Sequence, residues 1–461
     1  MNQQLSGDAQ LARAVANEPE AKLRRVLGLP SLIFFGLVYM VPLTVYDTYG
    51  IVSSGTAGRT SLAYLITLAA MTFTAISYGK MVRKFPVAGS AYSFASKSFG
   101  PNLGFLTGWL LLLDYVLLPL VNYLLIGVYL HEVFPSIPFW VFAVACIVLV
   151  TALNIIGITT VAMVSNIIVI VQLVFIAVFV LLAITYVTGN GNPVDFAAPF
   201  RGIGGEGADL SSLLAGSAVL CLSFLGFDAI STLVEEAKRP LRDIPRAIIV
   251  VTVGAGLLFV LISYLSQLVM PGTDFQNEVA AGNEVMDLAG GGFLIVFFLS
   301  AYVAGTVGSA IAAQASVSRV LFSMGRDGML PRSFFGYLSP RFKTPVRAIL
   351  LVSVISVAGI GIDADLLFSI VSFGALVAFS MVNLSVIRQY FFVDRLRGPS
   401  NTLRYLVAPL VGFLLTGWIW TSLQSNAIII GLSWLAVGLV YLAVLTRGFR
   451  RRAPETEDFS A

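Results

Sequence analysis

The chain has 461 residues, of which 57% are hydrophobic and only 11% are charged. Its mean hydropathy of +0.90 excludes an ordinary soluble domain, in which about a quarter of the residues are charged. The apolar residues gather in stretches of about 20, long enough to cross a bilayer as helices, and the pattern lacks the short alternating strands of a membrane β-barrel. We therefore expect an all-α integral membrane protein.

Twelve transmembrane helices are predicted from the apolar runs between charged or Pro- and Gly-rich breaks. In chain order they are expected at 32–57, 61–82, 101–130, 138–157, 162–187, 211–235, 245–270, 292–318, 346–362, 365–388, 404–423 and 426–446. Residues 1–30 and 447–461 form polar, basic tails. The first tail lacks the apolar core of a secretory signal, so the first long helix is expected to direct the chain to the membrane.

Basic residues are unevenly distributed among the predicted loops. With the N-terminus inside, all of the 28 Lys and Arg residues except Arg59 and Arg201 fall in the tails and inner loops. Basic loops remain cytoplasmic, so we expect both termini in the cytoplasm. The net charge of +4 then reflects topology, and no nucleic-acid partner is expected. The outer loop 271–291 is acidic, which predicts a solvated loop or, alternatively, one that concentrates a cation.

Cysteine and histidine are too scarce for several kinds of site. Cys146 and Cys221 lie inside apolar stretches and are expected to be small core residues rather than a disulfide. The single histidine, His131, excludes a histidine-based metal cluster. Neither a Ser-His-Asp pattern nor a nucleotide-binding motif is found, so we expect no enzymatic activity, no metal and no cofactor.

Carboxylates at bilayer depth are the most informative feature of the sequence. Asp47, Asp114 and Asp228 fall in spans 1, 3 and 6, and Glu235 and Glu236 follow at the inner end of span 6. A charged aspartate there costs at least a few kcal/mol, and these spans contain no Lys or Arg. Each acid could be protonated or bonded to a broken helix end. Otherwise the substrate supplies the missing positive charge, and Asp47, Asp114, Asp228 or Glu235 is a candidate proton carrier.

Spans 1 and 6 are predicted to be interrupted. Pro42 removes a helical hydrogen bond in span 1, and Gly226 allows the backbone to unwind in span 6. Each break precedes an aromatic residue and an aspartate, Tyr46-Asp47 and Phe227-Asp228. Paired interruptions in the two halves of a long chain indicate a transporter site near the bilayer midplane.

Aromatic residues surround the acids in the sequence. They are Tyr46, Tyr49, Trp109, Tyr115, Phe224 and Phe227. Aromatic faces attract ammonium groups, by up to about 2 kcal/mol where water is excluded. Ordinary helix packing is the alternative for each of them. Tyr115, directly after Asp114, and Phe224, one helical turn before Asp228, are the strongest candidates for substrate contact.

Several segments resemble the amino acid–polyamine–organocation superfamily of transporters. They are GFDAISTLVEEAKRPLRDIP at 226–245, SYGKMVRKFPVAGSAY at 77–92 and RVLFSMGRDGMLP at 319–331. Within the superfamily, the resemblance is to bacterial proton-linked putrescine importers, through YDTYGIVS at 46–53, LDY at 113–115 and NLSV at 383–386. The resemblance covers the chain from about residue 25 to 446.

The resemblance implies a fold and a function. The fold is a LeuT-like pair of inverted five-helix repeats, about 31–187 and 211–388, with two further helices at 404–446 inside a transporter domain of residues 31–446. The function is import of putrescine or a related diamine across the cytoplasmic (inner) membrane by proton symport. Substrate would lie between the two breaks, at Thr44, Tyr46, Asp47, Asp114, Tyr115, Phe224, Phe227 and Asp228.

The first break departs from the pattern of amino-acid-carrying relatives. Those carriers usually have a Gly-x-Gly motif at this break, and its exposed backbone N–H groups bind the substrate carboxylate. Here the matching residues are Pro42, Leu43 and Thr44. Proline has no amide hydrogen, and the other two side chains obstruct the backbone. This departure favours a substrate with an amine at each end.

Extended putrescine separates its two nitrogens by about 6 Å, so a single carboxylate cannot bind both. We expect Asp228 and either Asp47 or Asp114 to form the two poles, with Tyr115 and Phe224 beside the methylenes. Glu236 is expected to lie at the inner rim.

Other readings remain. An intramembrane aspartyl protease would fit Tyr46-Asp47 with Gly226-Phe227-Asp228, but the second glycine of its motif is missing. No repeated filter of a channel is found. A carrier of cationic amino acids with the same fold is the main alternative.

Overall fold

The structure is a computed structural model that describes residues 25–87, 90–157, 161–189, 194–203, 210–234, 236–448 and 450. It gives no side-chain placement for 161–165. Nearly all of this part of the chain is helical, and its one strand-like pairing is a bridge between Leu27 and Ala237. Glu235 lies outside the described residues.

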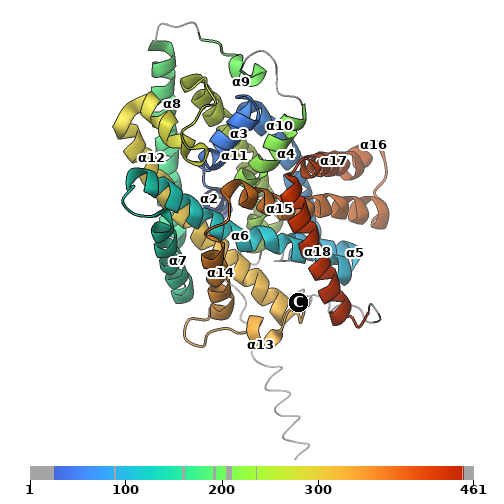
Figure 1. The fold of residues 1–461 in the computed structure, drawn as a ribbon. Helices are drawn as coiled ribbons and strands as arrows, with labels where there is room; N and C mark the ends of the chain where they lie inside the picture. The colour runs from blue at the N-terminus through green and yellow to red at the C-terminus, as the bar shows by residue number, and fades with distance from the viewer. Residues whose placement is uncertain are drawn as a thin grey trace, which may run out of the picture.

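The helical segments that correspond to the predicted spans form one bundle (Figure 1). They are α2 (Leu29–Met40) with α3 (Val45–Gly55), α4 (Thr60–Lys84), α6 (Pro101–Val133), α7 (Phe139–Ile156), α8 (Val161–Gly189), α10 (Leu210–Leu220) with η1 (Cys221–Phe224) and η2 (Ala229–Leu233), α11 (Pro240–Val269), α12 (Ala281–Arg326), α14 (Val346–Gly359), α15 (Ala364–Val386), α17 (Ala408–Thr421) and α18 (Ser425–Leu445). Among the described residues, 10 are long and apolar enough to span, the bent pair α2 and α3 adds another, and α14 is a shorter apolar helix. The predicted all-α membrane fold with interrupted spans 1 and 6 is confirmed.

Shorter elements connect the spans. They are α5 (Ser90–Phe99), α9 (Ala198–Arg201), η3 (Glu278–Ala280), α13 (Arg332–Phe335), α16 (Pro399–Thr402) and two π-helical turns, η4 (Ile387–Val393) and η5 (Leu403–Val407). Proline occupies one of the first two positions of α2, α6 and α11. It is favoured there because the first helical amides have no partner inside the helix.

Two elements differ from the sequence prediction. The expected outer loop 271–291 becomes helical at residue 281, where α12 begins, and α12 changes direction at Gly291, whose φ is 62°. Glycine tolerates this angle because it has no Cβ. Helix α5 was not predicted. It lies against α6, where a Cβ on Gly104 would come within 2.4 Å of the Ser96 Cβ.

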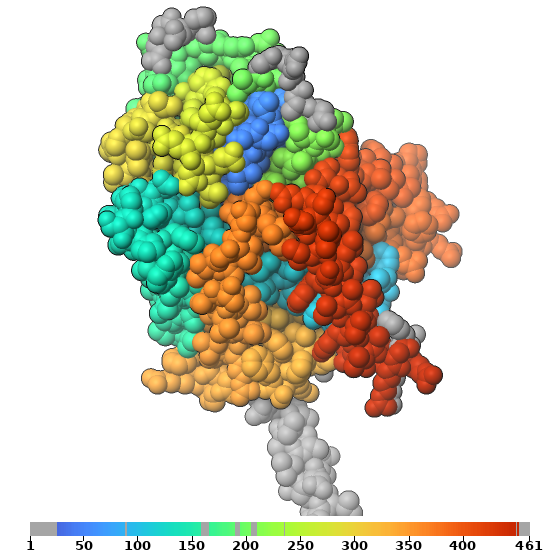
Figure 2. Space-filling model, viewed as in Figure 1, coloured from blue at the N-terminus to red at the C-terminus, as the bar shows by residue number. Residues whose placement is uncertain are grey.

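The last two spans cover one flank of the bundle, where they are drawn in red and orange (Figure 2). Helix α18 is fixed to α6 by two stacked tryptophans, Trp109 and Trp434, whose ring centroids are 4.6 Å apart. Each indole Nε1 donates to the backbone carbonyl of the other tryptophan, at 2.9 and 2.8 Å. Trp109 therefore has a packing role on the outside of the bundle.

The two ends of the bundle carry opposite charges. We call the end that includes α13 the basic face (Figure 1); Arg319 lies near the end of α12 there, and Arg341 follows α13. We call the opposite end, which includes α9, η3 and Asp274, the acidic face.

Candidate functional site

The first break comprises residues 41–44, between α2 and α3, which are bent by 50°. Val41 adopts a φ of 53°, which is rare for a β-branched residue and typical of a functionally constrained site. The Thr44 amide donates to the Val41 carbonyl at 2.8 Å, and the Asp47 amide donates to the Thr44 carbonyl at 3.0 Å. The chain therefore turns tightly here and uses its own amides to do so.

The second break comprises residues 225–228, between η1 and η2. Leu225 is extended, and Gly226 has a φ of 122°. A Cβ on Gly226 would lie 2.5 Å from the Tyr39 ring, so only glycine fits. Because Tyr39 is near the end of α2, this contact brings the two breaks side by side, as expected.

Asp228 lies at the second break with its carboxylate inside the protein, and only 2% of the residue is exposed. The Tyr115 hydroxyl donates to Oδ2 at 2.9 Å, and the Gly226 amide donates to Oδ1 at 3.2 Å. Tyr115 therefore contacts Asp228 directly, and its contact with substrate stays a prediction.

Asp114 is equally buried, with 2% exposure, and lies close enough to Asp228 for the two carboxylates to repel each other. Within the described residues, it accepts no hydrogen bond from a side chain. No basic residue of that part forms an ion pair with either acid. The pair thus forms a doubly acidic site without a protein counter-charge.

Aromatic rings line the side of this acid pair. Phe227 contacts Tyr78 and Phe379 at centroid distances of 5.6 and 5.1 Å. The Tyr78 hydroxyl is buried beside the Ser90 hydroxyl without a hydrogen bond of standard geometry, and Tyr78 interacts electrostatically with both acids. The site therefore offers an aromatic wall and a weakly bonded hydroxyl.

Phe224 points elsewhere. Its ring packs on Phe259 at 5.5 Å and Tyr64 at 6.5 Å, between α11 and α4. A contact of Phe224 with substrate stays a prediction, which this placement does not support.

Asp47 belongs to a separate cluster. Its Oδ2 accepts from the Thr44 hydroxyl and its Oδ1 from the Tyr302 hydroxyl, both at 2.6 Å. The Tyr129 hydroxyl donates to the Tyr46 carbonyl at 2.9 Å, and its ring lies 4.5 Å from that of Tyr302. Each oxygen of this carboxylate therefore accepts one side-chain hydrogen bond within the protein.

The two clusters are held by different parts of α6. Tyr115 bonds Asp228, whereas Tyr129, further along the helix, bonds the residue before Asp47. Asp47 and Asp228 thus belong to separate hydrogen-bond clusters.

Other predicted aromatic residues brace α3. The Tyr46 hydroxyl is 2.9 Å from the Ser266 hydroxyl, and the Tyr49 hydroxyl donates to Gln267 at 3.2 Å. Both partners lie on α11, so these tyrosines fix α3 against it.

Sequence reasoning missed Tyr39, Tyr78 and Tyr302. Tyr302 is 255 positions from Asp47, with which it bonds, and no local pattern links the two. Tyr78 lies within the 77–92 segment of the family resemblance, which was the available signal for it.

Comparison with known proteins agrees with this geometry. The amino acid permease family profile matches residues 27–447. The low-affinity putrescine importer PlaP of Escherichia coli K12 is 40% identical over 96% of this chain and 98% of its own. The branched-chain amino acid permease BcaP of Bacillus subtilis is 26% identical, over 94% of this chain and 95% of its own. The methylthioribose transporter of the same species is 28% identical, over 92% and 94%.

The predicted superfamily resemblance is confirmed by a match that spans nearly all of the chain. A multi-pass helical bundle with two adjoining breaks is the architecture in which such transporters bind substrate. This chain belongs to the amino acid permease family of membrane transporters, within the amino acid–polyamine–organocation superfamily.

Proposed function

We propose that this protein imports putrescine or a related short diamine across the cytoplasmic membrane, coupled to proton entry. The observation that carries the proposal is the pair of buried carboxylates, Asp114 and Asp228, which repel each other and lack a basic partner in the described residues. A dication supplies both missing charges. The putrescine importer with 40% identity supports the same substrate class.

The geometry supports Asp114 as the second pole. Asp47 belongs to a separate cluster with Thr44 and Tyr302, whereas Asp114 and Asp228 lie close enough to repel each other. Each would bind one ammonium, with Tyr115 holding Asp228 in place. The methylenes would lie against Phe227, where each buried CH₂ contributes about 0.8 kcal/mol.

An amino acid substrate is the second candidate, supported by the relationship to the branched-chain amino acid permease. Such a substrate needs donors for its carboxylate. At the first break Pro42 has no amide hydrogen, and the amides of Thr44 and Asp47 already bond to backbone carbonyls. A substrate carboxylate would also approach Asp114 and Asp228. Two like charges about 4 Å apart repel by roughly 4 kcal/mol at an effective dielectric of 20.

Proton entry with the diamine requires a carboxyl that stays protonated while the diamine is bound. Asp114 and Asp228 would both be charged in the proposed complex, so neither can carry a proton inward together with the substrate. Asp47, whose oxygens accept bonds from the Thr44 and Tyr302 hydroxyls, is the candidate carrier among the described acids. Glu235 stays a prediction from the sequence.

Transport assays test the proposed function. Proteoliposomes containing the purified protein should accumulate labelled putrescine when the outside is acidic. Cadaverine should compete strongly, and ornithine and arginine weakly. Competition by spermidine, a longer polyamine, tests whether the site accepts a longer substrate. Equal competition by ornithine and putrescine would favour the amino acid alternative. Uptake that does not depend on the pH gradient would contradict coupling to proton entry.

The orientation is also a proposal, with the basic face and both termini in the cytoplasm. Single cysteines at the exposed positions Ser333 and Ser400 should react only from the cytoplasmic side. Cysteines at the exposed positions Ser136 and Gln276 should react only from outside. The native Cys146 and Cys221 are buried and should stay silent. Outside labelling of Ser333→Cys would reverse the assignment.

A further inference from the structure

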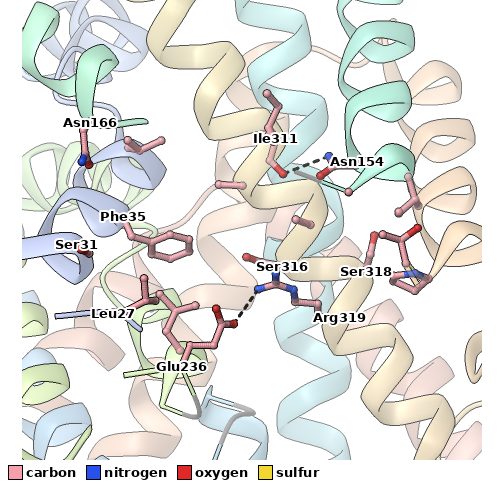
Figure 3. A pocket seen from close by; sticks show the side chains of 18 residues that line it. Leu27, Ser31, Phe35, Asn154, Asn166, Glu236, Ile311, Ser316, Ser318 and Arg319 are labelled. Carbon is pink, nitrogen blue, oxygen red and sulfur yellow. Dashed lines mark hydrogen bonds and ion pairs between the residues drawn. The ribbon is translucent and has the colours of Figure 1, made fainter. Parts of the chain in front are cut away.

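A cavity of about 270 Å³ opens on the basic face. Its walls come from α2, the end of span 6, α7, α8, α12 and α14 (Figure 3). Phe35, Leu233 and Ile311 give it apolar surface, and Glu236 and Arg319 give it charge. Glu236 follows Asp228 on the same span, so the cavity adjoins the segment that carries the proposed central site.

The backbone around Glu236 is fixed without using its carboxylate. The Leu27 amide donates to the Glu236 carbonyl at 3.0 Å, and the Lys238 amide donates to the Leu27 carbonyl at 2.8 Å. These two bonds attach the end of span 6 to the start of α2. The carboxylate therefore has a defined position at the cavity while its oxygens remain available.

The carboxylate of Glu236 has one weak partner. Arg319 Nη1 lies 3.8 Å from Oε1, and the side chains are 62% and 26% exposed, respectively (Figure 3). A strong charge-assisted hydrogen bond is about 1 Å shorter, and exposed pairs contribute little stability. Another cation can therefore displace the guanidinium.

A hydrogen-bond acceptor lies on another wall of the cavity. Asn154 donates through Nδ2 to the Ile311 carbonyl at 3.3 Å and to Gln314 Oε1 at 2.8 Å. Since both amide hydrogens are used, Oδ1 remains as an acceptor for a ligand. Figure 3 shows Asn154 and Glu236 apart, with apolar side chains in the same cavity. An ammonium is a donor only, so this arrangement suits an alkyl diamine.

We propose that the cavity is a second, low-affinity diamine site on the exit route, where Glu236 binds one ammonium and Arg319 competes with it. This inference rests on the proposed function and adds a site to it. A carrier must release its substrate as well as bind it, and transport requires sites weak enough to leave. Arg319 lowers the affinity of this site because a diamine must displace it from Glu236.

The test uses a reporter cysteine in the cavity. Ser31 lines it and is exposed, so Ser31→Cys in inverted membrane vesicles should react with N-ethylmaleimide from the cytoplasmic side. Putrescine should slow this reaction. The half-protecting concentration is the putrescine concentration that halves the rate of labelling. Arg319→Gln should lower it by about two- to fivefold, the range for loss of an exposed charge pair. Glu236→Gln should raise it by about tenfold or more.

Arg341→Gln is the matched control, because it removes one exposed charge from the same face without lining the cavity. Its half-protecting concentration should equal that of the parent. A gain of affinity in Arg319→Gln cannot arise from misfolding.

Protection that is unchanged in both Glu236→Gln and Arg319→Gln would overturn the inference, because it would then originate at the central site. Stronger protection by ornithine than by putrescine would also overturn it and indicate a ligand with a carboxylate for Arg319. Uptake of putrescine into right-side-out vesicles separates the two proposals. If the parent protein takes up putrescine but the protection experiment gives either of these results, only this inference fails. If the parent protein takes up no putrescine, the proposed function itself is contradicted.

Discussion

Asp47 and Asp228 have similar sequence surroundings, yet the structure gives them different environments. Each follows an aromatic residue at a broken span. Both accept two hydrogen bonds, Asp47 from Thr44 and Tyr302 and Asp228 from Tyr115 and the Gly226 amide. Within the described part of the chain, only Asp228 of the two faces a second carboxylate, Asp114. A pair of acids without a counter-charge needs a cation or a proton, so the comparison favours the second region, and not the first, as the substrate site.

The largest effect should come from Asp228→Asn. This change preserves shape but leaves one ammonium desolvated without a partner, a loss of several kcal/mol and so of about 100-fold or more in affinity. Equilibrium binding of labelled putrescine in detergent measures it, separately from proton coupling. Asp47→Asn is the matched change and should cost less than about tenfold. Equal losses would remove the distinction between the two regions. Normal binding without transport in Asp228→Asn would make Asp228 a proton relay.

A second, smaller effect should come from Tyr302→Phe. It removes one hydrogen bond from the buried Asp47 carboxylate, which should destabilise the protein by about 1–3 kcal/mol. Thermal unfolding in detergent should show a lower midpoint, with little change in putrescine affinity. In an Asp47→Asn background the same substitution should have a smaller effect, because the partner charge is gone. Weakened binding at unchanged stability would instead place Asp47 in the substrate site.

The smallest effect should come from Tyr78→Phe. The buried hydroxyl lies beside that of Ser90 without a hydrogen bond of standard geometry, so its removal should lower the unfolding temperature little. If it bonds the bound diamine, its loss should weaken binding by about fivefold, the typical value for one hydrogen bond. Calorimetric titration measures the effect on putrescine affinity, and thermal unfolding of the same samples measures the effect on stability. Unchanged affinity would exclude Tyr78 from the site.

Sequence reasoning reached the spans and the breaks because their signals are local. Apolar length predicts a span, and Pro42 and Gly226 each act on their own backbone. Phe224 shows where local reasoning fails. It was placed beside Asp228 by helical periodicity, but Leu225 is extended and Gly226 has a φ of 122°, so the helix no longer continues between them. The bond from Tyr302 to Asp47 depends on tertiary packing, which no spacing in the sequence encodes.

The helical start of α12 was also not predictable from composition. Its acidic, glycine-rich sequence resembles a loop, yet it and the preceding turn η3 pack against α3. A Cβ on Gly50 would come within 2.2 Å of the Glu278 carbonyl oxygen, and one on Gly282 within 3.1 Å of Tyr46. These close approaches cover α3 at the acidic face.

The most direct test of the account compares putrescine with n-butylamine, which has one ammonium on a similar carbon chain. If Asp114 and Asp228 each bind one ammonium, the parent protein should bind putrescine at least about tenfold more tightly, since a hydrogen-bonded charge contributes about 1.5–3 kcal/mol. Asp114→Asn should lose most of this preference while still binding n-butylamine through Asp228. A preference that survives unchanged in Asp114→Asn would contradict the paired-acid site.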